Sequence, residues 1–353
     1  MPTRRSATLG AALSAVVVVG LAAPAAAERP DDRFDLQAHR GGTGLYTEST
    51  RESFANALEL GVTTLELDTQ VTEDGAVVVT HDRQINGDKC RDTAPAFAGD
   101  LEYPYVGKYI TDLTLAQVQT VECGYQPLPQ HPEQQIAPGP MLELGDVFDL
   151  VRYYRANQVT LNIETKVEAA APEETAPREE FVRAVVDEVE AHKMERQVTI
   201  QSFDWGALEL VGELNPRLPR VALTNYDFLE VGQPGASVWL GGLDADDFGG
   251  DLVAMAEQLG VEAISPVHGF PQDGTVADDD YTPYVTAKMV DDAHAAGIEV
   301  IPWTVDDPDT MRRLIETGID GLITDRPDRL RDVMDECDLR LPKQYTAPHG
   351  SIL

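Results

Sequence analysis

The feature that most constrains the fold of this chain is an alternation of short β-rich segments with longer helical ones, beginning at residue 34. Predicted strands cover residues 34–39, 64–69, 77–81, 159–164, 198–202, 220–223, 263–265, 299–304 and 321–324. Predicted helices cover residues 50–60, 144–155, 178–192, 205–214, 251–259, 284–296, 308–317 and 327–337. Strands that alternate with helices favour a parallel sheet whose strands are joined by crossover helices.

About eight strand–helix units in roughly 300 residues favour a single closed (β/α)8 barrel, a TIM barrel, over the alternative of an open doubly wound sheet. Polar or aromatic residues end many of the predicted strands, namely His39, Asp68, His81, Glu164, Gln201 and Trp303. In a barrel the carboxyl ends of the strands converge on one mouth, where barrel enzymes have their active sites. We therefore expect these side chains to lie together.

The first 27 residues have the pattern of a secretory signal. Arg4 and Arg5 precede an apolar run, and three alanines at residues 25–27 provide a cleavage site with small side chains. This pattern predicts removal of residues 1–27 and a secreted protein, with the export route, Sec or Tat, left open. The alternative, a membrane anchor, requires a longer apolar run. The rest is interpreted as one domain, residues 34–340, followed by a C-terminal tail, residues 341–353.

The chain is strongly acidic, with 61 Asp and Glu residues against 27 Lys and Arg residues and a net charge of −34. A field of this sign repels nucleic acid and anionic membrane surfaces, so neither is expected as a partner. No later segment is long and apolar enough for stable membrane insertion. An anionic substrate would have to be attracted locally, by a metal ion and a few well-placed cations.

Residues 82–140 contain few clear elements and are predicted to be an insertion over the barrel mouth, acting as a lid or specificity element. Two of the three cysteines, Cys90 and Cys123, lie in it. In an oxidising compartment they could form a disulfide, which would stabilise the fold by roughly 3–4 kcal/mol through loop closure. The third, Cys337, is expected to be unpaired.

Glu66 and Asp68 are candidate metal ligands. They are two residues apart on a predicted strand, so their side chains point to the same face. Two inward carboxylates would each cost several kcal/mol unless they were neutralised. Oxygen-only ligands favour Mg²⁺ or Ca²⁺, and Glu164, on another strand, can supply a third carboxylate. The alternative is that Glu66 and Asp68 are surface charges on an edge strand.

His39 and His81 are candidate acid–base residues, because an unperturbed imidazole has a pKa near 6.5 and can both accept and donate protons near neutral pH. Arg40 offers a planar fork for phosphate oxygens, and Lys166 a second positive charge. A structural role is the alternative for the histidines, and a structural salt bridge is the alternative for Lys166. No role is predicted for the remaining histidines, namely His131, His192, His268, His294 and His349.

Several motifs, in this order, resemble those of the glycerophosphodiester phosphodiesterase family. They are His39-Arg40-Gly41, Thr47-Glu48-Ser49-Thr50, Glu66-Leu67-Asp68, Thr72-x-Asp74-Gly75, His81-Asp82, Glu164-x-Lys166, Gln201-Ser202-Phe203, Trp303-Thr304-Val305 and the stretch from Gly318 to Pro327. The resemblance spans residues 36–334. The chain departs from the family where Pro-Glu-Asn-Thr is usual, because Thr47 replaces the proline and Ser49 replaces the asparagine.

The resemblance implies a (β/α)8 barrel that hydrolyses small-molecule glycerophosphodiesters to glycerol 3-phosphate and an alcohol. It implies His39 and His81 as the acid–base pair. It implies Glu66, Asp68 and Glu164 as ligands of one divalent cation, Ca²⁺ or Mg²⁺. Arg40 and Lys166 would hold the phosphate, and Gln201 and Trp303 would line the substrate pocket, although Trp303 could instead be barrel packing.

Our leading hypothesis is a secreted, metal-dependent glycerophosphodiester phosphodiesterase. The alternative on the same barrel is a phospholipase D or sphingomyelinase-like enzyme, which needs an apolar rim that Phe97, Tyr103, Tyr105 and Tyr109 could provide. A third hypothesis is an inactive barrel that only binds a ligand. Headgroup specificity and oligomeric state are left open.

Overall fold

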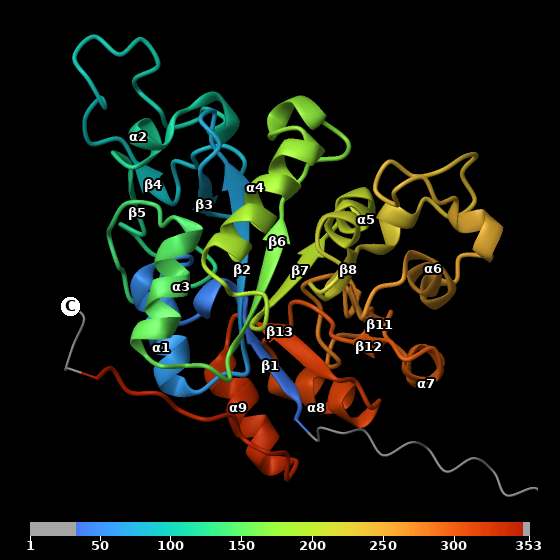
Figure 1. The fold of residues 1–353 in the computed structure, drawn as a ribbon. Helices are drawn as coiled ribbons and strands as arrows, with labels where there is room; N and C mark the ends of the chain where they lie inside the picture. The colour runs from blue at the N-terminus through green and yellow to red at the C-terminus, as the bar shows by residue number, and fades with distance from the viewer. Residues whose placement is uncertain (1–32, 349–353) are drawn as a thin grey trace, which may run out of the picture. The chain divides into compact units, whose positions relative to one another are not determined.

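Eight parallel strands form a nearly closed barrel in the computed structural model, which describes residues 33–348 (Figure 1). Around the barrel the strands follow the order β12, β9, β8, β7, β6, β2, β1, β13. Their bounds are β1 Asp35–Ala38, β2 Thr64–Val71, β6 Thr160–Thr165, β7 Val198–Ser202, β8 Arg220–Thr224, β9 Ala263–Pro266, β12 Glu299–Val300 and β13 Gly321–Thr324. The predicted TIM barrel is therefore confirmed, and the predicted signal, residues 1–27, lies outside the described residues.

Backbone hydrogen bonds close the ring between its last two strands. The Asp320 amide donates to the carbonyl of Val300 at 3.0 Å, and the Ile323 amide to the carbonyl of Pro302 at 3.0 Å. β13 therefore has β1 on one side and, on the other, the segment that begins with β12 and continues to Pro302. The last strand, β13, thus lies between the first strand, β1, and the segment after β12, which completes the ring.

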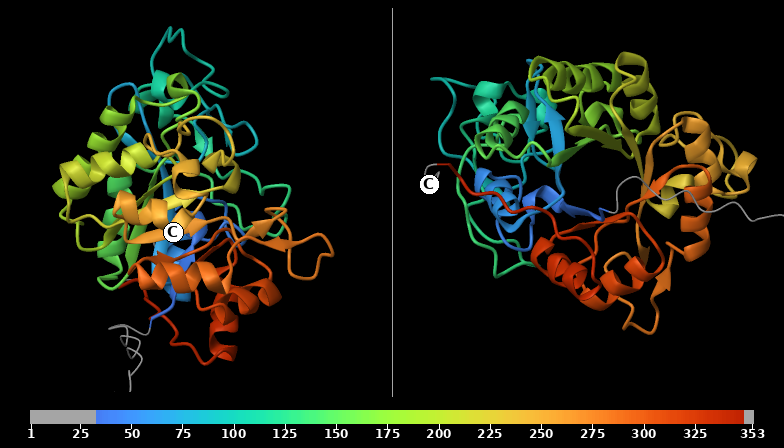
Figure 2. Two further views of the ribbon diagram at one scale, coloured as in Figure 1. Left: turned by 90° about the vertical axis from the view of Figure 1, so that its right-hand side faces the viewer. Right: turned by 60° about the horizontal axis from the view of Figure 1, so that its bottom comes forward.

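The long helices lie outside the barrel (Figure 2). They are α1 Arg51–Leu60, α3 Leu144–Tyr153, α4 Arg178–Ala191, α5 Trp205–Leu214, α6 Leu252–Leu259, α7 Ala287–Ala295, α8 Pro308–Glu316 and α9 Pro327–Glu336. Side-chain oxygens cap several of their first turns, as where Thr50 accepts from the Ser53 amide and Asp307 from the Thr310 amide. Because such caps satisfy amides that have no partner inside the helix, polar residues in the sequence mark where these helices begin.

The hydrophobic core lies between the barrel and the helices. Leu65 and Leu67 of β2 are fully buried in it, as are Val182 and Val185 of α4. The alternation along β2 therefore packs its leucines against the helices and turns Glu66 and Asp68 into the barrel, as period-two geometry requires.

Residues 77–81 are a correction to the predicted barrel strands. β3, Val77–Val79, pairs antiparallel with β2 and does not belong to the parallel ring. β2 continues three residues beyond Asp68, and the chain turns back at residues 72–76. His81 therefore does not end a barrel strand as predicted; it reaches the mouth on the returning arm of a hairpin, where the Thr80 amide donates to the carbonyl of Asp68 at 3.0 Å.

The insertion, residues 82–140, has a small hydrophobic core of its own. Its elements are short, namely β4 Cys90–Arg91, the 3-10 turn Ile110–Asp112, α2 Leu115–Val118 and β5 Glu122–Cys123. They enclose buried apolar side chains that include Tyr105, Ile110 and Leu113. Cys90 and Cys123 form a disulfide between β4 and β5, and Cys337 is a free thiol within residues 33–348.

The described part of the predicted C-terminal tail lies along the barrel rather than apart from it. Tyr345 is buried, and its amide donates to the carbonyl of Leu58 in α1 at 3.0 Å. No helix within residues 33–348 is long and apolar enough to cross a membrane.

We predict that replacing both Cys90 and Cys123 with serine lowers the free energy of unfolding by about 3–4 kcal/mol, because the disulfide closes a loop with a sequence separation of 33 residues. Denaturant unfolding would measure the loss. Cys337→Ser is the matched control and should leave the midpoint almost unchanged. Equal midpoints for the double variant and the wild type would contradict the prediction.

Candidate active site

Three buried carboxylates form the centre of the barrel mouth. Glu66 and Asp68 extend from β2, and Glu164 lies on the neighbouring β6, where its Cα is paired in register with that of Asp68. One oxygen from each carboxylate can be chosen so that all three lie within 4.8 Å of one another. The predicted ligand trio is therefore brought together, and the edge-strand alternative for Glu66 and Asp68 is wrong.

These carboxylates are close enough to raise one another's proton affinity. Burial, followed by repulsion from Asp68, raises the pKa of Glu66 to about 7. Burial, together with repulsion from Asp68 and Glu66, raises the pKa of Glu164 to about 8, although Lys166 opposes this. Burial also favours the neutral form of Asp68, but Arg40, His81 and Lys166 outweigh it and hold the pKa of Asp68 well below its usual range.

The donor set fits a hard divalent cation. It consists of three carboxylates and has no sulfur or nitrogen ligand, as Ca²⁺ and Mg²⁺ prefer. Asp68 Oδ2 lies 2.9 Å from Arg40 Nε, but the two atoms are not aligned for a hydrogen bond. This buried oxygen thus accepts no hydrogen bond from the described residues and retains a lone pair for a cation.

His39 is held by a carboxylate from the far end of the chain. Pairing of β1 with β13 sets Ala38 opposite Thr324, so the next residues, His39 and Asp325, lie side by side. His39 Nδ1 is 2.6 Å from Asp325 Oδ1. Burial and Arg40 lower the pKa of His39, but Asp325 and Glu66 outweigh them and raise it above its ordinary value.

His81 has a matching partner in the next residue. Its Nδ1 lies 2.9 Å from Asp82 Oδ1, and Asn86 donates to the other oxygen of Asp82 at 3.0 Å. Burial, Arg40 and Lys166 lower the pKa of His81 to about 4. In both histidines Nδ1 is held by a carboxylate, which leaves Nε2 as the ring nitrogen available to a substrate.

Arg40 reaches the site because its backbone takes a left-handed conformation, with φ of 52°. Its amide donates to Glu66 Oε2 at 2.9 Å, and its Nη1 donates to Glu48 Oε2 at 3.1 Å. The next residue must be glycine, because a Cβ at Gly41 would lie 2.5 Å from the Ser53 hydroxyl in α1. The motif His39-Arg40-Gly41 therefore forms a tight turn that directs the guanidinium of Arg40 into the mouth.

The other predicted site residues, Lys166, Gln201 and Trp303, also lie at the mouth, and each of them contacts a neighbouring protein group there. Lys166 Nζ is 3.1 Å from Glu164 Oε1. Gln201 is almost fully buried and donates to Glu66 Oε1 at 2.7 Å, so it orients a candidate metal ligand. Trp303 both lines the pocket and packs on the barrel interior, where its indole donates to the carbonyl of Ser265 at 2.9 Å.

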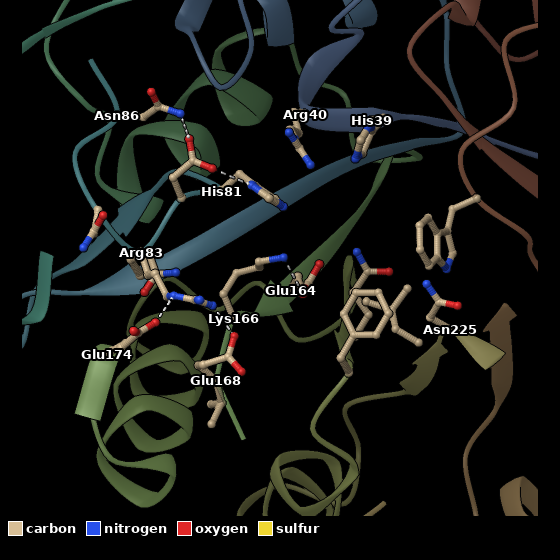
Figure 3. Close-up of a pocket in the computed structure, with 18 of the residues that line it drawn as sticks. His39, Arg40, His81, Arg83, Asn86, Glu164, Lys166, Glu168, Glu174 and Asn225 are labelled. Atoms are coloured by element: carbon tan, nitrogen blue, oxygen red, sulfur yellow. Dashed lines mark hydrogen bonds and ion pairs between the residues drawn. The ribbon is translucent and has the colours of Figure 1, made fainter. Parts of the chain in front are cut away.

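The site opens into a pocket of about 940 Å³ with two ends of different chemistry. His39, Arg40, His81, Glu164 and Lys166 point into the space between those ends (Figure 3). One end is charged and is formed by Arg83, Glu168 and Glu174, where Arg83 forms ion pairs with both carboxylates. The other end is aromatic and includes Phe203, Phe228, Trp239 and Trp303.

Sequence reasoning missed several polar residues that support the site. Asp325 and Glu48 lie inside the motifs named above, but the sequence predicts no role for them or for Lys89. His131 was predicted to have no role, yet its Nε2 lies 3.1 Å from Asp325 Oδ2. The motifs could have marked Asp325 and Glu48, whereas no local signal identifies Lys89 or His131, because both lie in the irregular insertion.

Comparisons with known proteins agree on one family. Residues 39–329 match the model of the glycerophosphoryl diester phosphodiesterase family. The glycerophosphodiester phosphodiesterase of Caldanaerobacter subterraneus is 25% identical over 297 residues, covering 83% of this chain and 94% of that protein.

Solved structures with a similar fold include proteins that carry names from the same family. A putative glycerophosphoryl diester phosphodiesterase from Silicibacter pomeroyi has a TM-score of 0.69 and 28% identity, with 87% of this chain and 95% of that chain covered. A phosphodiesterase from Oleispira antarctica, solved in complex with the product sn-glycerol 3-phosphate, has a TM-score of 0.61 and 18% identity, with 85% and 96% covered. The second likeness shows the fold alone.

We predict that Ca²⁺ or Mg²⁺ raises the melting temperature more at pH 8 than at pH 6. The raised pKa values of Glu66 and Glu164 mean that the contribution of these two groups to the stability of the metal-free fold falls as pH rises from about 4.5 towards 8, because the buried carboxyls must ionise. A bound cation offsets that charge, so thermal melts should show a rise of about 5 °C or more at pH 8 and a smaller one at pH 6.

Glu164→Gln should remove most of this cation effect, whereas Glu179→Gln, on the exposed side of α4, should retain it. An equal cation effect in the wild type and in Glu164→Gln would contradict the assignment.

Proposed function

The chain belongs to the glycerophosphoryl diester phosphodiesterase family and is therefore a phosphoric diester hydrolase, and we propose that it is a secreted, metal-dependent enzyme releasing sn-glycerol 3-phosphate from glycerophosphodiesters. The observation that carries the proposal is a cation-competent carboxylate trio flanked by two histidine–aspartate pairs. The name of the Caldanaerobacter relative and the product bound to the Oleispira protein support the substrate class. Secretion is supported by residues 1–27 of the sequence alone.

The histidines divide the proton chemistry between them in this proposal. His81 has a lowered pKa, is neutral at pH 7 and accepts at Nε2 the proton of the attacking nucleophile, which is water or the substrate's own 2-hydroxyl. Attack by the 2-hydroxyl gives a cyclic phosphate, which water then opens to glycerol 3-phosphate. His39 has a raised pKa and donates a proton from Nε2 to the oxygen of the departing alcohol. One P–O bond forms and one breaks, so one proton enters the protein at His81 and one leaves it at His39. Each aspartate holds its imidazole in the tautomer that this transfer needs.

The cations of the mouth stabilise negative charge on the phosphoryl group. Arg40 offers its fork to the phosphoryl oxygens, and Lys166, which follows β6, adds a second positive charge near the other oxygen of Asp68. Glu66, Asp68 and Glu164 would hold one Ca²⁺ or Mg²⁺, which when bound polarises a phosphoryl oxygen and offsets further negative charge.

Small, water-soluble diesters are favoured over intact lipid. Of the aromatic residues predicted to form an apolar rim, Tyr105 is fully buried, and Tyr109 donates its hydroxyl to Glu174 at 2.7 Å. Phe97 is exposed, but Tyr103 packs against Tyr105. The rim required by a phospholipase D or sphingomyelinase-like enzyme is therefore not assembled by these residues. The hypothesis of an inactive barrel has no support, since every predicted catalytic residue lines or contacts the pocket.

We predict that His39→Ala and His81→Ala each lower kcat for release of glycerol 3-phosphate from glycerophosphocholine by about 10²–10⁴-fold, because each removes one proton transfer. A coupled assay of the product measures the rate, and thermal melts check that the fold is intact. His192→Ala, at the end of α4, serves as the matched control and should turn over like the wild type. Near-normal turnover in either active-site variant would refute the assigned roles.

Removal of divalent cations with a chelator should abolish turnover, and added Ca²⁺ or Mg²⁺ should restore it, because the three carboxylates require a counter-charge to accept an anionic diester. Activity before and after dialysis against chelator, followed by titration with each metal, measures this dependence. Undiminished activity after exhaustive chelation would exclude a metal-dependent reaction.

A further inference from the structure

The insertion begins with Asp82 and includes Asn86, which donates to Asp82, and two further side chains of the insertion contact the aspartates of the two histidine–aspartate pairs. These side chains are Lys89, just before the disulfide-bonded Cys90, and His131, in the second half of the insertion. Each contacts the carboxylate behind a candidate catalytic histidine, on the side away from the imidazole. Neither contact is predictable from the barrel, because both residues come from the irregular segment outside it.

Lys89 connects the His81 pair to Arg40. Its Nζ is 2.8 Å from Asp82 Oδ2 and 2.8 Å from Glu48 Oε1. Asp82 holds His81, and Glu48 holds Arg40. A continuous series of charged contacts therefore runs from His81 to Arg40, with Lys89 in the middle. The groups facing the lysine are those two carboxylates, which raise its pKa against its burial, and Arg40, which opposes them.

Lys89 is held in place by its neighbours in the chain. Its amide donates to the carbonyl of Asn86 at 3.1 Å, and its own carbonyl accepts from the Gly124 amide at 2.9 Å. The disulfide between Cys90 and Cys123 ties together the same two segments one residue further along. The ammonium group is therefore attached to the most firmly crosslinked part of the insertion.

His131 supports the other pair. Its Nε2 lies 3.1 Å from Asp325 Oδ2, while Asp325 Oδ1 is 2.6 Å from His39 Nδ1. Asp325 thus lies between two imidazoles, one from the barrel and one from the insertion. The hydrogen bond with Asp325 raises the pKa of His131, and Asp306 and Glu133 raise it further, while burial opposes them.

The insertion also supports the loop in which the family motif is altered. Thr47 receives the Ala137 amide on its hydroxyl at 3.0 Å, and its own amide donates to the carbonyl of Gln135 at 3.0 Å. Ser49, with φ of 58°, takes a left-handed conformation that asparagine adopts more readily, and its amide donates to the carbonyl of Arg40 at 3.0 Å. Contacts from the insertion thus hold the loop that presents Glu48.

We propose that the insertion is an integral part of the catalytic site, in which Lys89 and His131 act as positioning residues that hold Asp82 and Asp325 against the catalytic histidines. This inference rests on the proposed function, because it assumes that His39 and His81 transfer protons. A free-standing lid would cover the mouth without touching Asp325 or Glu48, which lie outside the insertion. Here His39 follows a barrel strand and His81 follows the β2–β3 hairpin, and the insertion supports both.

Substitution of Lys89 tests the His81 side. Lys89→Met should lower kcat for glycerophosphocholine by about 10- to 100-fold with little change in KM, the size of effect found when the outer partner of a functional side chain is removed. It should also move the acidic limb of the kcat–pH profile up by about half a pH unit. Without the ammonium group, the negative charges of Asp82 and Glu48 raise the pKa of His81. Lys89→Arg keeps the positive charge and should retain most of the wild-type kcat and a nearly unshifted acidic limb. Lys108→Met, elsewhere in the insertion, is the matched control.

Substitution of His131 tests the His39 side and has a different signature. His131→Leu should lower kcat to a similar extent but move the alkaline limb upward, because the donor His39 then holds its proton more tightly. His131→Gln keeps a side-chain donor for Asp325 and should restore most of the rate. His192→Gln, away from the mouth, is the matched control.

Imidazole NMR titration without substrate separates failure of this inference from failure of the proposed function. A rise in the pKa of His81 in Lys89→Met supports positioning even if the wild type fails to hydrolyse the diester, which would overturn the proposed function alone. Wild-type rates, pH limbs and imidazole titrations in both variants would overturn the inference. A loss of rate that accompanies lower thermal stability, with unmoved limbs and no rescue by Lys89→Arg or His131→Gln, would also overturn it.

Discussion

Three carboxylates buried side by side are the constraint on which the rest of the site depends. Glu66, Asp68 and Glu164 cannot all be ionised in the barrel mouth unless positive charge lies close to them. Arg40 and Lys166 supply part of that charge, and the geometry fits a divalent cation for the remainder. In the proposed function the same positive groups attract a phosphodiester to a protein whose overall charge is −34, so one electrostatic requirement would account for both the stability and the chemistry of the site.

Barrel geometry meets this requirement through strand register. Parallel pairing sets Asp68 beside Glu164 and brings His39 next to Asp325. The hairpin of β2 and β3 then returns His81 to the same level, although β3 is not a barrel strand. Strands β2 and β6 thus hold the three carboxylates, the segments that follow β1 and β3 carry the two histidines, and the insertion contacts the aspartates beside them.

Much of the fold could be predicted because its signals are local. The apolar spacing within α4 and the alternation of leucine and carboxylate in β2 each follow from the period of one element. The segment 77–81 was misassigned because a short run of valines has the same composition in an antiparallel hairpin as in a parallel barrel. Gln201 was placed at the pocket correctly, but its contact with Glu66 depends on the packing of neighbouring strands.

The sequence by itself determined the barrel, the chemical types of the site residues and their places at the mouth, since spacing along a strand decides which side chains share a face. Only the tertiary structure decided their partners. Asp325 is 286 residues from His39, and Lys89 and His131 lie in a segment without regular periodicity. Contacts between residues so far apart arise from closure of the barrel and from the fold of the insertion, and nothing in the local sequence specifies them.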